Sequence, residues 1–207
     1  MKIIFLGAQA SGKGTQAILL AKKLRVPHIS TGDIFRSKVE DGDALGKKLE
    51  TYMDKGKLVP NKITNKVIED RLLKQDIKKG FILDGYPRTL AQAKFLDKIV
   101  KFDKVIKIKI SDREAVERIK NRRSCDCGKT YNLKYNPPKK EEICDLCGDK
   151  LFTRDDDKPK AVRKRLSIFH KKIETLIKYY TKKDILILIN GEQEIKKIHK
   201  DILELLK

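Results

Sequence analysis

The 207-residue chain has no long apolar run, no internal repeat and no low-complexity tail. Its first apolar stretch, Ile3 to Leu6, reaches Gly7 after only a few residues. A membrane-spanning helix needs about 20 apolar residues, and the apolar part of a secretion signal needs about 7 to 15. We therefore expect neither, and we expect a cytoplasmic protein without a membrane partner.

Aromatic residues are scarce, at 6% of the chain, and they are not interleaved with the basic residues. The formal net charge of +20 would suit a polyanion such as nucleic acid or a nucleoside triphosphate. However, lysine is spread along nearly every expected helix, as compositional bias or heat adaptation would also produce. Without a base-stacking surface we expect no nucleic-acid partner. A zinc-containing nucleic-acid-binding protein remains the alternative from another class.

Cysteine is confined to one window that is poor in apolar residues. Cys144 and Cys147 have the spacing of a zinc knuckle, and Cys125 and Cys127 are closer by one residue, although in an extended chain both sulfurs still share one face. Such clustering favours a metal over a disulfide framework. Reduced thiols, a disulfide, or three cysteines completed by Asp126 remain alternatives. We predict one structural Zn²⁺ bound by all four cysteines, which supplies folding energy and takes no part in a reaction.

The stretch from Gly7 to Thr15 lies between an apolar run and an apolar-periodic segment, and it predicts a strand, a phosphate loop and a helix. Small residues let successive backbone N–H groups approach an anion, and the helix dipole points to the same place. Lys13 adds a mobile charge, and the Thr15 hydroxyl can reach a magnesium ion. The motif G-x-x-x-x-G-K-[ST] is displaced here, because Gly14 follows the lysine and the hydroxyl comes one place later.

A second polar cluster follows the apolar run 80–84. Asp84 ends this predicted strand, and a carboxylate at the tip of a parallel strand facing a phosphate loop is suited to holding the water shell of Mg²⁺. The run Gly85-Tyr86-Pro87-Arg88-Thr89 then brings an arginine back over the same cleft.

Apolar periodicity predicts strands that alternate with helices, which indicates an α/β fold with a parallel sheet covered on both faces. Between them, Thr31 or Asp33 is expected to cap a helix, and residues 30–60 to form short helices broken by Gly42, Gly46 and Gly56. The predicted strands are 3–6, 28–30, 80–84, 104–110 and 184–189, and the longer helices are 17–24, 62–73, 90–100, 161–180 and a closing helix that ends at 206.

These motifs together resemble those of bacterial-type adenylate kinases of the long, zinc-binding lid form, in the nucleoside monophosphate kinase family. The resemblance covers the whole chain. It implies a P-loop three-layer fold with a central parallel five-stranded sheet, and reversible Mg²⁺-dependent phosphoryl transfer, ATP + AMP = 2 ADP, in adenine nucleotide homeostasis. It also implies a monomer. A kinase for UMP or CMP is the alternative within the class, but the long lid and the pairing of Thr31 with Gln92 argue against it.

The resemblance divides the chain into a core (1–29, 60–117 and 159–207), an AMP-binding domain (30–59) and a lid (118–158) that carries the zinc site. We expect the last two to close over the sheet when both nucleotides bind.

The resemblance also assigns residues to the two nucleotides. For ATP these are Ala10, Ser11, Gly12, Lys13, Gly14, Thr15, Arg118, Arg122, Thr130, Tyr131 and Gln193. For AMP they are Thr31, Arg36, Lys57, Leu58, Val59, Gly85, Tyr86, Pro87, Arg88, Gln92, Arg154 and Arg165. The residues expected to act on the transferring phosphoryl group are Lys13, Arg88, Arg122, Arg154 and Arg165, and Thr15 and Asp84 are expected to hold magnesium through water.

The chain departs from the family pattern inside the phosphate loop. Where the family usually has Pro-Gly, this chain has Gln9-Ala10, so a position that often favours glycine's backbone freedom carries a side chain. We expect this departure either to slow turnover or to weaken ATP binding, and the sequence does not decide between the two.

Overall fold

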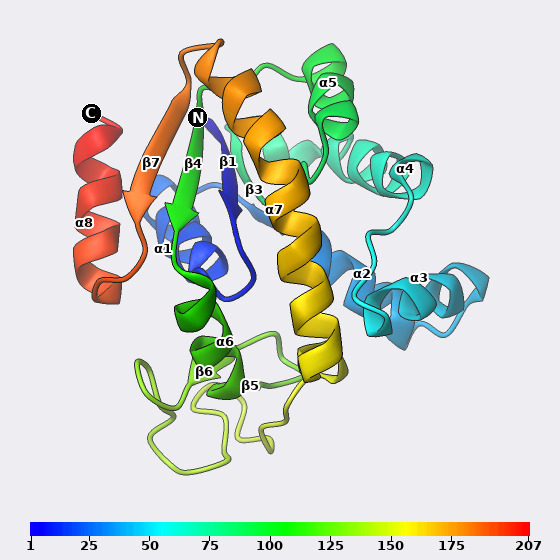
Figure 1. Cartoon of the computed structure of the whole chain (residues 1–207), viewed down its shortest axis with the longest axis vertical. Helices are drawn as coiled ribbons and strands as arrows, with labels where there is room; N and C mark the ends of the chain where they lie inside the picture. The colour runs from blue at the N-terminus through cyan, green and yellow to red at the C-terminus, as the bar shows by residue number, and fades with distance from the viewer.

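The structure, a computed structural model, describes residues 1–207 and is built on one parallel sheet of five strands in the order β2-β3-β1-β4-β7 (Figure 1). Both the α/β class and the five-stranded parallel sheet predicted above are confirmed. The strands are β1 (Lys2–Gly7), β2 (His28–Ser30), β3 (Phe81–Asp84), β4 (Lys104–Lys109) and β7 (Leu186–Asn190).

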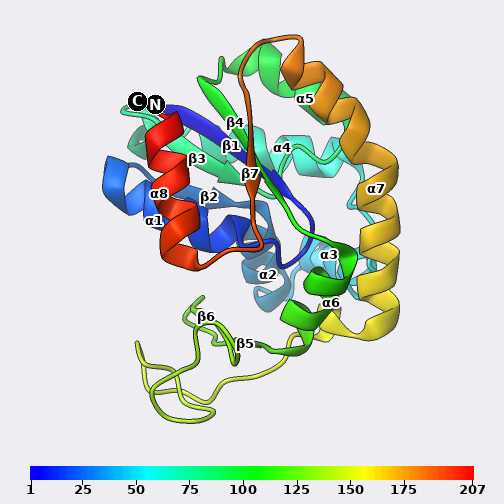
Figure 2. The same ribbon diagram turned by 60° about the vertical axis from the view of Figure 1, so that its left-hand side comes forward.

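Helices cover both faces of the sheet, because alternate side chains of β1 point to opposite sides. Ile3 and Phe5 pack against one set of helices, and Ile4 and Leu6 against the other. Figure 2 shows the two layers to either side of the strands. The first layer consists of α1 (Lys13–Leu24) and α8 (Ile195–Leu205), and the second of α4 (Asn61–Leu72), α5 (Leu90–Ile99) and α7 (Pro159–Thr181). A 3₁₀ turn, η1 (Gln75–Ile77), links α4 to β3. None of these helices has an apolar stretch long enough to cross a bilayer.

The central strand β1 is flanked by β3 on one side and β4 on the other, so the connections diverge at its carboxyl end. Parallel sheets bind ligands in the crevice outside such a switch point. Phe5 of β1 pairs with Asp84 of β3, and the chain after Gly7 of β1 forms the phosphate loop. The topology therefore brings the two predicted polar clusters to one edge of the sheet.

A helical segment beside the sheet has its own small apolar cluster, which includes Phe35 and Leu49. It contains α2 (Thr31–Glu40) and α3 (Ala44–Asp54). Two details of the prediction are wrong here. The cap of α2 is Ser30, whose hydroxyl accepts a hydrogen bond from the Asp33 N–H. Gly46 does not break a helix but lies inside α3, where a Cβ would come within 2.1 Å of a backbone oxygen of α2.

The cysteine-containing segment forms a loop-rich body at the end of the sheet opposite the chain termini (Figure 2). Its strands pair antiparallel around a cluster of Cys125, Tyr131, Cys144 and Leu151. α6 (Asp112–Lys120) leads into this body from β4 and packs against Ala8 and α7. The elements of the body are β5 (Arg122–Ser124), β6 (Thr130–Asn132) and η2, a 3₁₀ turn (Asp155–Asp157). The sequence reasoning missed α6. Its signal is Ser111 as a helix N-cap, and the Ser111 hydroxyl accepts a hydrogen bond from the Glu114 N–H.

Candidate active site

The phosphate loop connects β1 to α1 and leaves the start of the helix free for an anion. Gly12 caps α1 in the left-handed region at a φ of 89°, which glycine adopts without strain. No side chain caps the helix, and no acidic residue lies in its first turn. The first N–H groups of α1 and its dipole are therefore available to phosphate. Lys13 Nζ meanwhile donates to the carbonyl of Ala8 at 3.2 Å.

Gly14, which separates Lys13 from the Thr15 hydroxyl, is required at this position for a steric reason. A Cβ at position 14 would lie 3.3 Å from Oδ2 of Asp84, so Gly14 lets this carboxylate approach the helix start closely. Asp84 is 7% exposed, and its Oδ1 is buried without a partner. His28 Nε2 lies 3.7 Å from the other oxygen. A buried carboxylate oxygen with no donor fits a water molecule of the magnesium shell.

Positive charge converges on this point. Desolvation, with the charges of Arg88, Arg122 and Arg165, lowers the pKa of Lys13 to about 8, although Asp84 opposes the shift. Burial and the neighbouring Arg165 likewise lower the pKa of Arg88. Burial tends to raise the pKa of Asp84, but His28, Lys13 and Arg88 lower it overall, so it is ionised at neutral pH. Cations that depress one another's pKa in this way favour an anion among them.

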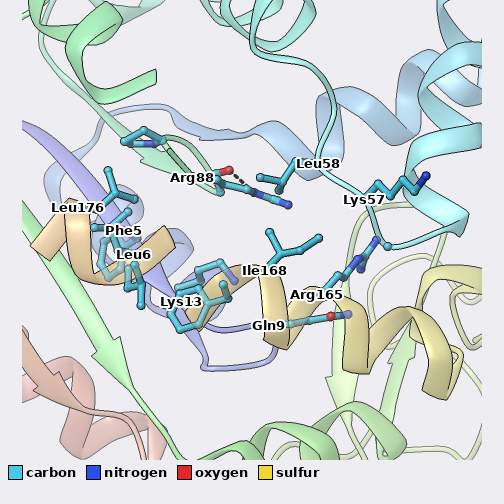
Figure 3. A pocket seen from close by; sticks show the side chains of 16 residues that line it. Phe5, Leu6, Gln9, Lys13, Lys57, Leu58, Arg88, Arg165, Ile168 and Leu176 are labelled. Carbon is cyan, nitrogen blue, oxygen red and sulfur yellow. Dashed lines mark hydrogen bonds between the residues drawn. The ribbon is translucent and has the colours of Figure 1, made fainter. Parts of the chain in front are cut away.

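A pocket opens between the phosphate loop, the segment after α3 and the middle of α7 (Figure 3). Phe5, Ile168 and Leu176 form part of its apolar wall. Of the predicted AMP residues, those that line it are Lys57, Leu58, Gly85, Pro87, Arg88 and Arg165. Val59 and Tyr86 do not line it but are buried, and the Tyr86 hydroxyl donates to Asn65 at 2.6 Å.

Three of the arginines predicted to act on the phosphoryl group, which are Arg122, Arg154 and Arg165, are held by partners that the sequence reasoning missed. Arg122 pairs with Asp157, and Arg165 with Asp156. Both carboxylates are buried, and they come from the acidic run that immediately follows Arg154, a signal visible in the sequence. Arg154 donates instead to Ser124 at 2.7 Å and to Thr130 at 3.0 Å. Burial and the charges of Arg36 and Arg122 lower the pKa of Arg154 to about 10.

Three predicted AMP residues make contacts within the protein. The buried Thr31 hydroxyl donates to the Asp84 carbonyl at 2.8 Å, and Arg36 pairs with Asp33. Gln92 accepts from the backbone N–H of Arg88 at 2.6 Å and donates to Asn61 at 3.0 Å. Its amide is thus occupied by protein partners, although each end keeps one further hydrogen-bonding position.

The other side chains predicted to bind ATP, which are Arg118, Thr130, Tyr131 and Gln193, are divided between two places. Arg118 donates to the carbonyl of Gly191 at 2.8 Å, which brings it beside the loop of Gln193, and the Tyr135 ring covers it with a centroid distance of 5.1 Å. Gln193 Nε2 donates to the Asn190 carbonyl at 3.0 Å.

Tyr131 is buried inside the lid segment, and its hydroxyl accepts from the Asp145 N–H at 2.7 Å. Its side chain therefore packs in the cysteine cluster, where the hydroxyl also lies 3.5 Å from Cys144 Sγ. Thr130, its neighbour, is exposed.

The four cysteines gather at one point as free thiols, and all four Sγ atoms lie within 4.8 Å of one another. The Cys125–Cys147 and Cys127–Cys144 sulfurs are 3.3 and 3.6 Å apart, beyond the roughly 2.05 Å of a disulfide. Four thiolates around one Zn²⁺ at about 2.3 Å have sulfurs about 3.8 Å apart. The donor set therefore fits one tetrahedral metal ion, including the tight Cys-x-Cys pair.

Comparison with known proteins agrees with this geometry. Residues 5–185 match the family model described as adenylate kinase. The adenylate kinase of Caldicellulosiruptor bescii is 47% identical over 212 residues, covering 100% of this chain and 99% of the relative. Those of Thermoanaerobacter pseudethanolicus and Methanocella arvoryzae are 49% and 46% identical, and each alignment covers 98% of this chain and 96% of the relative. The chain belongs to the adenylate kinase family.

Proposed function

We propose that the cleft between the phosphate loop and the segment 56–58 is the place where this phosphotransferase moves the terminal phosphoryl group of ATP to AMP, giving two ADP. The convergence of Lys13, Arg88, Arg122 and Arg165 beside Asp84 carries the proposal. Phosphoryl transfer requires little covalent chemistry from a protein, so positioning and cationic stabilisation of the transferring group supply most of the catalysis.

The roles follow from where each group lies. Lys13 and the free amides at the start of α1 hold the donor's phosphates, and Arg88 with Arg36 holds the acceptor's phosphate. Arg122, Arg154 and Arg165 neutralise charge that develops on the phosphoryl group in flight. Arg118, the loop of Gln193 and the segment of Thr130 and Tyr131 form the site for the ATP base. Thr31, Val59 and Gln92 surround the site for the AMP base.

Adenylate kinases use magnesium with ATP. In this chain the Thr15 hydroxyl and the unpartnered oxygen of Asp84 would hold its water shell. When bound, the ion neutralises the negative charge of the donor's phosphates.

The four cysteines are assigned one structural zinc. The lid cluster buries only Tyr131 and Leu151 besides two of the cysteines, so apolar burial contributes little to its stability. Metal binding can supply the missing folding energy. The cluster lies outside the pocket, which supports a role in holding the lid rather than in chemistry.

Residues 30–59 are proposed to act as the AMP-binding domain and residues 118–158 as the lid. Each has an apolar cluster separate from the two clusters on the sheet, which supports movement as a unit. We further propose that the protein acts as a monomer and binds neither nucleic acid nor a membrane. Four reduced thiols in a metal knuckle are consistent with the reducing cytoplasm.

A coupled assay of ATP with AMP, UMP or CMP tests the proposal. We expect turnover with AMP to exceed that with the other two, and Lys13→Ala to lower kcat by at least about a hundredfold because it removes charge stabilisation from the cleft. Lys164→Ala, an exposed lysine of α7, is the matched control and should behave as wild type. Comparable turnover with UMP would overturn the substrate assignment, and an active Lys13→Ala enzyme would overturn the site.

A further inference from the structure

We infer that Gln9 is a positioning residue for phosphoryl transfer, acting on Arg122 through Asp157. Its side-chain Nε2 donates to Oδ1 of Asp157 at 2.9 Å, across 148 positions of sequence. In Figure 3, Gln9 reaches from the phosphate loop toward α7. The contact therefore joins the loop that holds the donor's phosphates to η2, at the end of the lid.

The same carboxylate orients an arginine. Arg122 Nε donates to Oδ2 of Asp157 at 2.8 Å, and a second guanidinium nitrogen pairs with Oδ1. Two parallel hydrogen bonds fix the plane of a guanidinium group as well as its position. The side chain of Asp157 is 1% exposed. Because one edge of Arg122 is held in this way, its remaining donors are directed away from Asp157, and its charge is felt at Lys13.

Gln9 has the chemistry that this arrangement needs. Its amide is neutral, so it holds Asp157 without competing for the negative charge that binds Arg122. A lysine at position 9 would compete with Arg122, and a carboxylate would repel Asp157. The Oε1 atom of Gln9 is buried without a partner, although the side chain lines the same pocket as Lys13 and Arg88. An unpaired buried carbonyl is costly, which indicates that the orientation is set by the bond to Asp157.

Gln9 thus positions Asp157, and Asp157 in turn positions Arg122. Loss of the amide leaves Asp157 held by Arg122 alone, so the pair is free to move as a unit away from the phosphate loop. A guanidinium displaced by 1 Å stabilises a transferring phosphoryl group much less. This inference rests on the proposed role of Arg122 in transfer, but the bond from Gln9 is a separate feature of this chain.

The test is a double-mutant cycle on kcat. Gln9→Ala should lower kcat at least about tenfold, as expected for one hydrogen bond to a charged group, and leave the KM for AMP within about twofold. Gln9→Glu should lower kcat further, because it faces Asp157 with a second carboxylate. Gln75→Ala, an exposed glutamine in η1, is the control and should have no effect.

The second arm makes the same substitution in the Asp157→Ala and Arg122→Ala backgrounds. There Gln9→Ala should cause no further fall in kcat, because the residue through which it acts is gone. An equal fall in all three backgrounds, or no fall in the wild type, would overturn the inference. A fully active Arg122→Ala enzyme would refute the proposed role of Arg122 itself, which separates the two failures. A role confined to folding would shift the melting temperature and leave kcat per folded molecule unchanged, which would also count against the inference.

Discussion

Raising the pH above 8 should weaken ATP binding, because Lys13 then loses its proton in the free enzyme. Desolvation and three guanidinium groups lower its pKa from 10.5 to about 8. The phosphates of ATP replace these repulsions with attraction and return the pKa toward its ordinary value. Binding therefore takes up a proton above pH 8, and affinity falls as pH rises between the two pKa values.

The size of the effect follows from those two values. If bound ATP returns the pKa of Lys13 from about 8 to its ordinary value of 10.5, the Kd for ATP should rise about tenfold between pH 7 and pH 9. At pH 9 binding should take up about 0.9 proton. Above pH 10.5 the loss should level off, because the complex then loses the proton as well.

Isothermal titration calorimetry in two buffers of different ionisation enthalpy measures both the Kd and the proton uptake. Lys13→Arg is the matched control, since arginine stays charged throughout this range and any remaining pH dependence belongs to ATP or to other groups. A Kd that does not change from pH 7 to pH 9, or the same change in Lys13→Arg, would refute the view that clustered cations perturb Lys13.

Three further predictions concern the metal sites and the loop. Elemental analysis should find about one zinc per chain, and Cys147→Ser should speed amide exchange in the lid while the magnesium requirement stays unchanged; unaltered exchange would show that the metal does not hold the lid. Ala10→Gly should raise the melting temperature by about 2 °C, because φ at this residue is 57° and a left-handed residue with a Cβ costs about 1 kcal/mol, partly offset by glycine's freedom when unfolded; a lower melting temperature would contradict this. Gly14→Ala should raise the magnesium concentration needed for half-maximal rate, because the new Cβ crowds Asp84; an unchanged requirement would separate Asp84 from the magnesium site.

The sheet and its polar edge could be predicted because the signals are local. Apolar runs such as Ile3 to Leu6 end at turn residues, and a parallel sheet brings the ends of its strands together. On this basis the sequence predicts Asp84 beside the phosphate loop, and the pairing of Phe5 with Asp84 confirms this position. The knuckle was equally visible, since ligand spacing is itself the signal.

What could not be predicted depends on contacts between distant parts of the chain. In the sequence, nothing distinguishes Asp156 and Asp157 from other acidic residues. Only the fold buries them against Arg165 and Arg122. Gln9 appeared only as a departure from a family pattern, and its partner lies 148 positions away. The cap of α2 is Ser30 instead of Thr31 or Asp33, because all three residue types can cap a helix and only the backbone conformation decides between them.

The central claim is that the cation cluster passes a phosphoryl group directly from ATP to AMP. Single-turnover measurement with ATP labelled at its terminal phosphorus tests it most directly. With AMP present, the label should appear in ADP formed from AMP and be absent from inorganic phosphate, and Lys13→Ala should slow its appearance at least about a hundredfold. Label released as inorganic phosphate, or transferred equally fast by Lys13→Ala, would contradict the account.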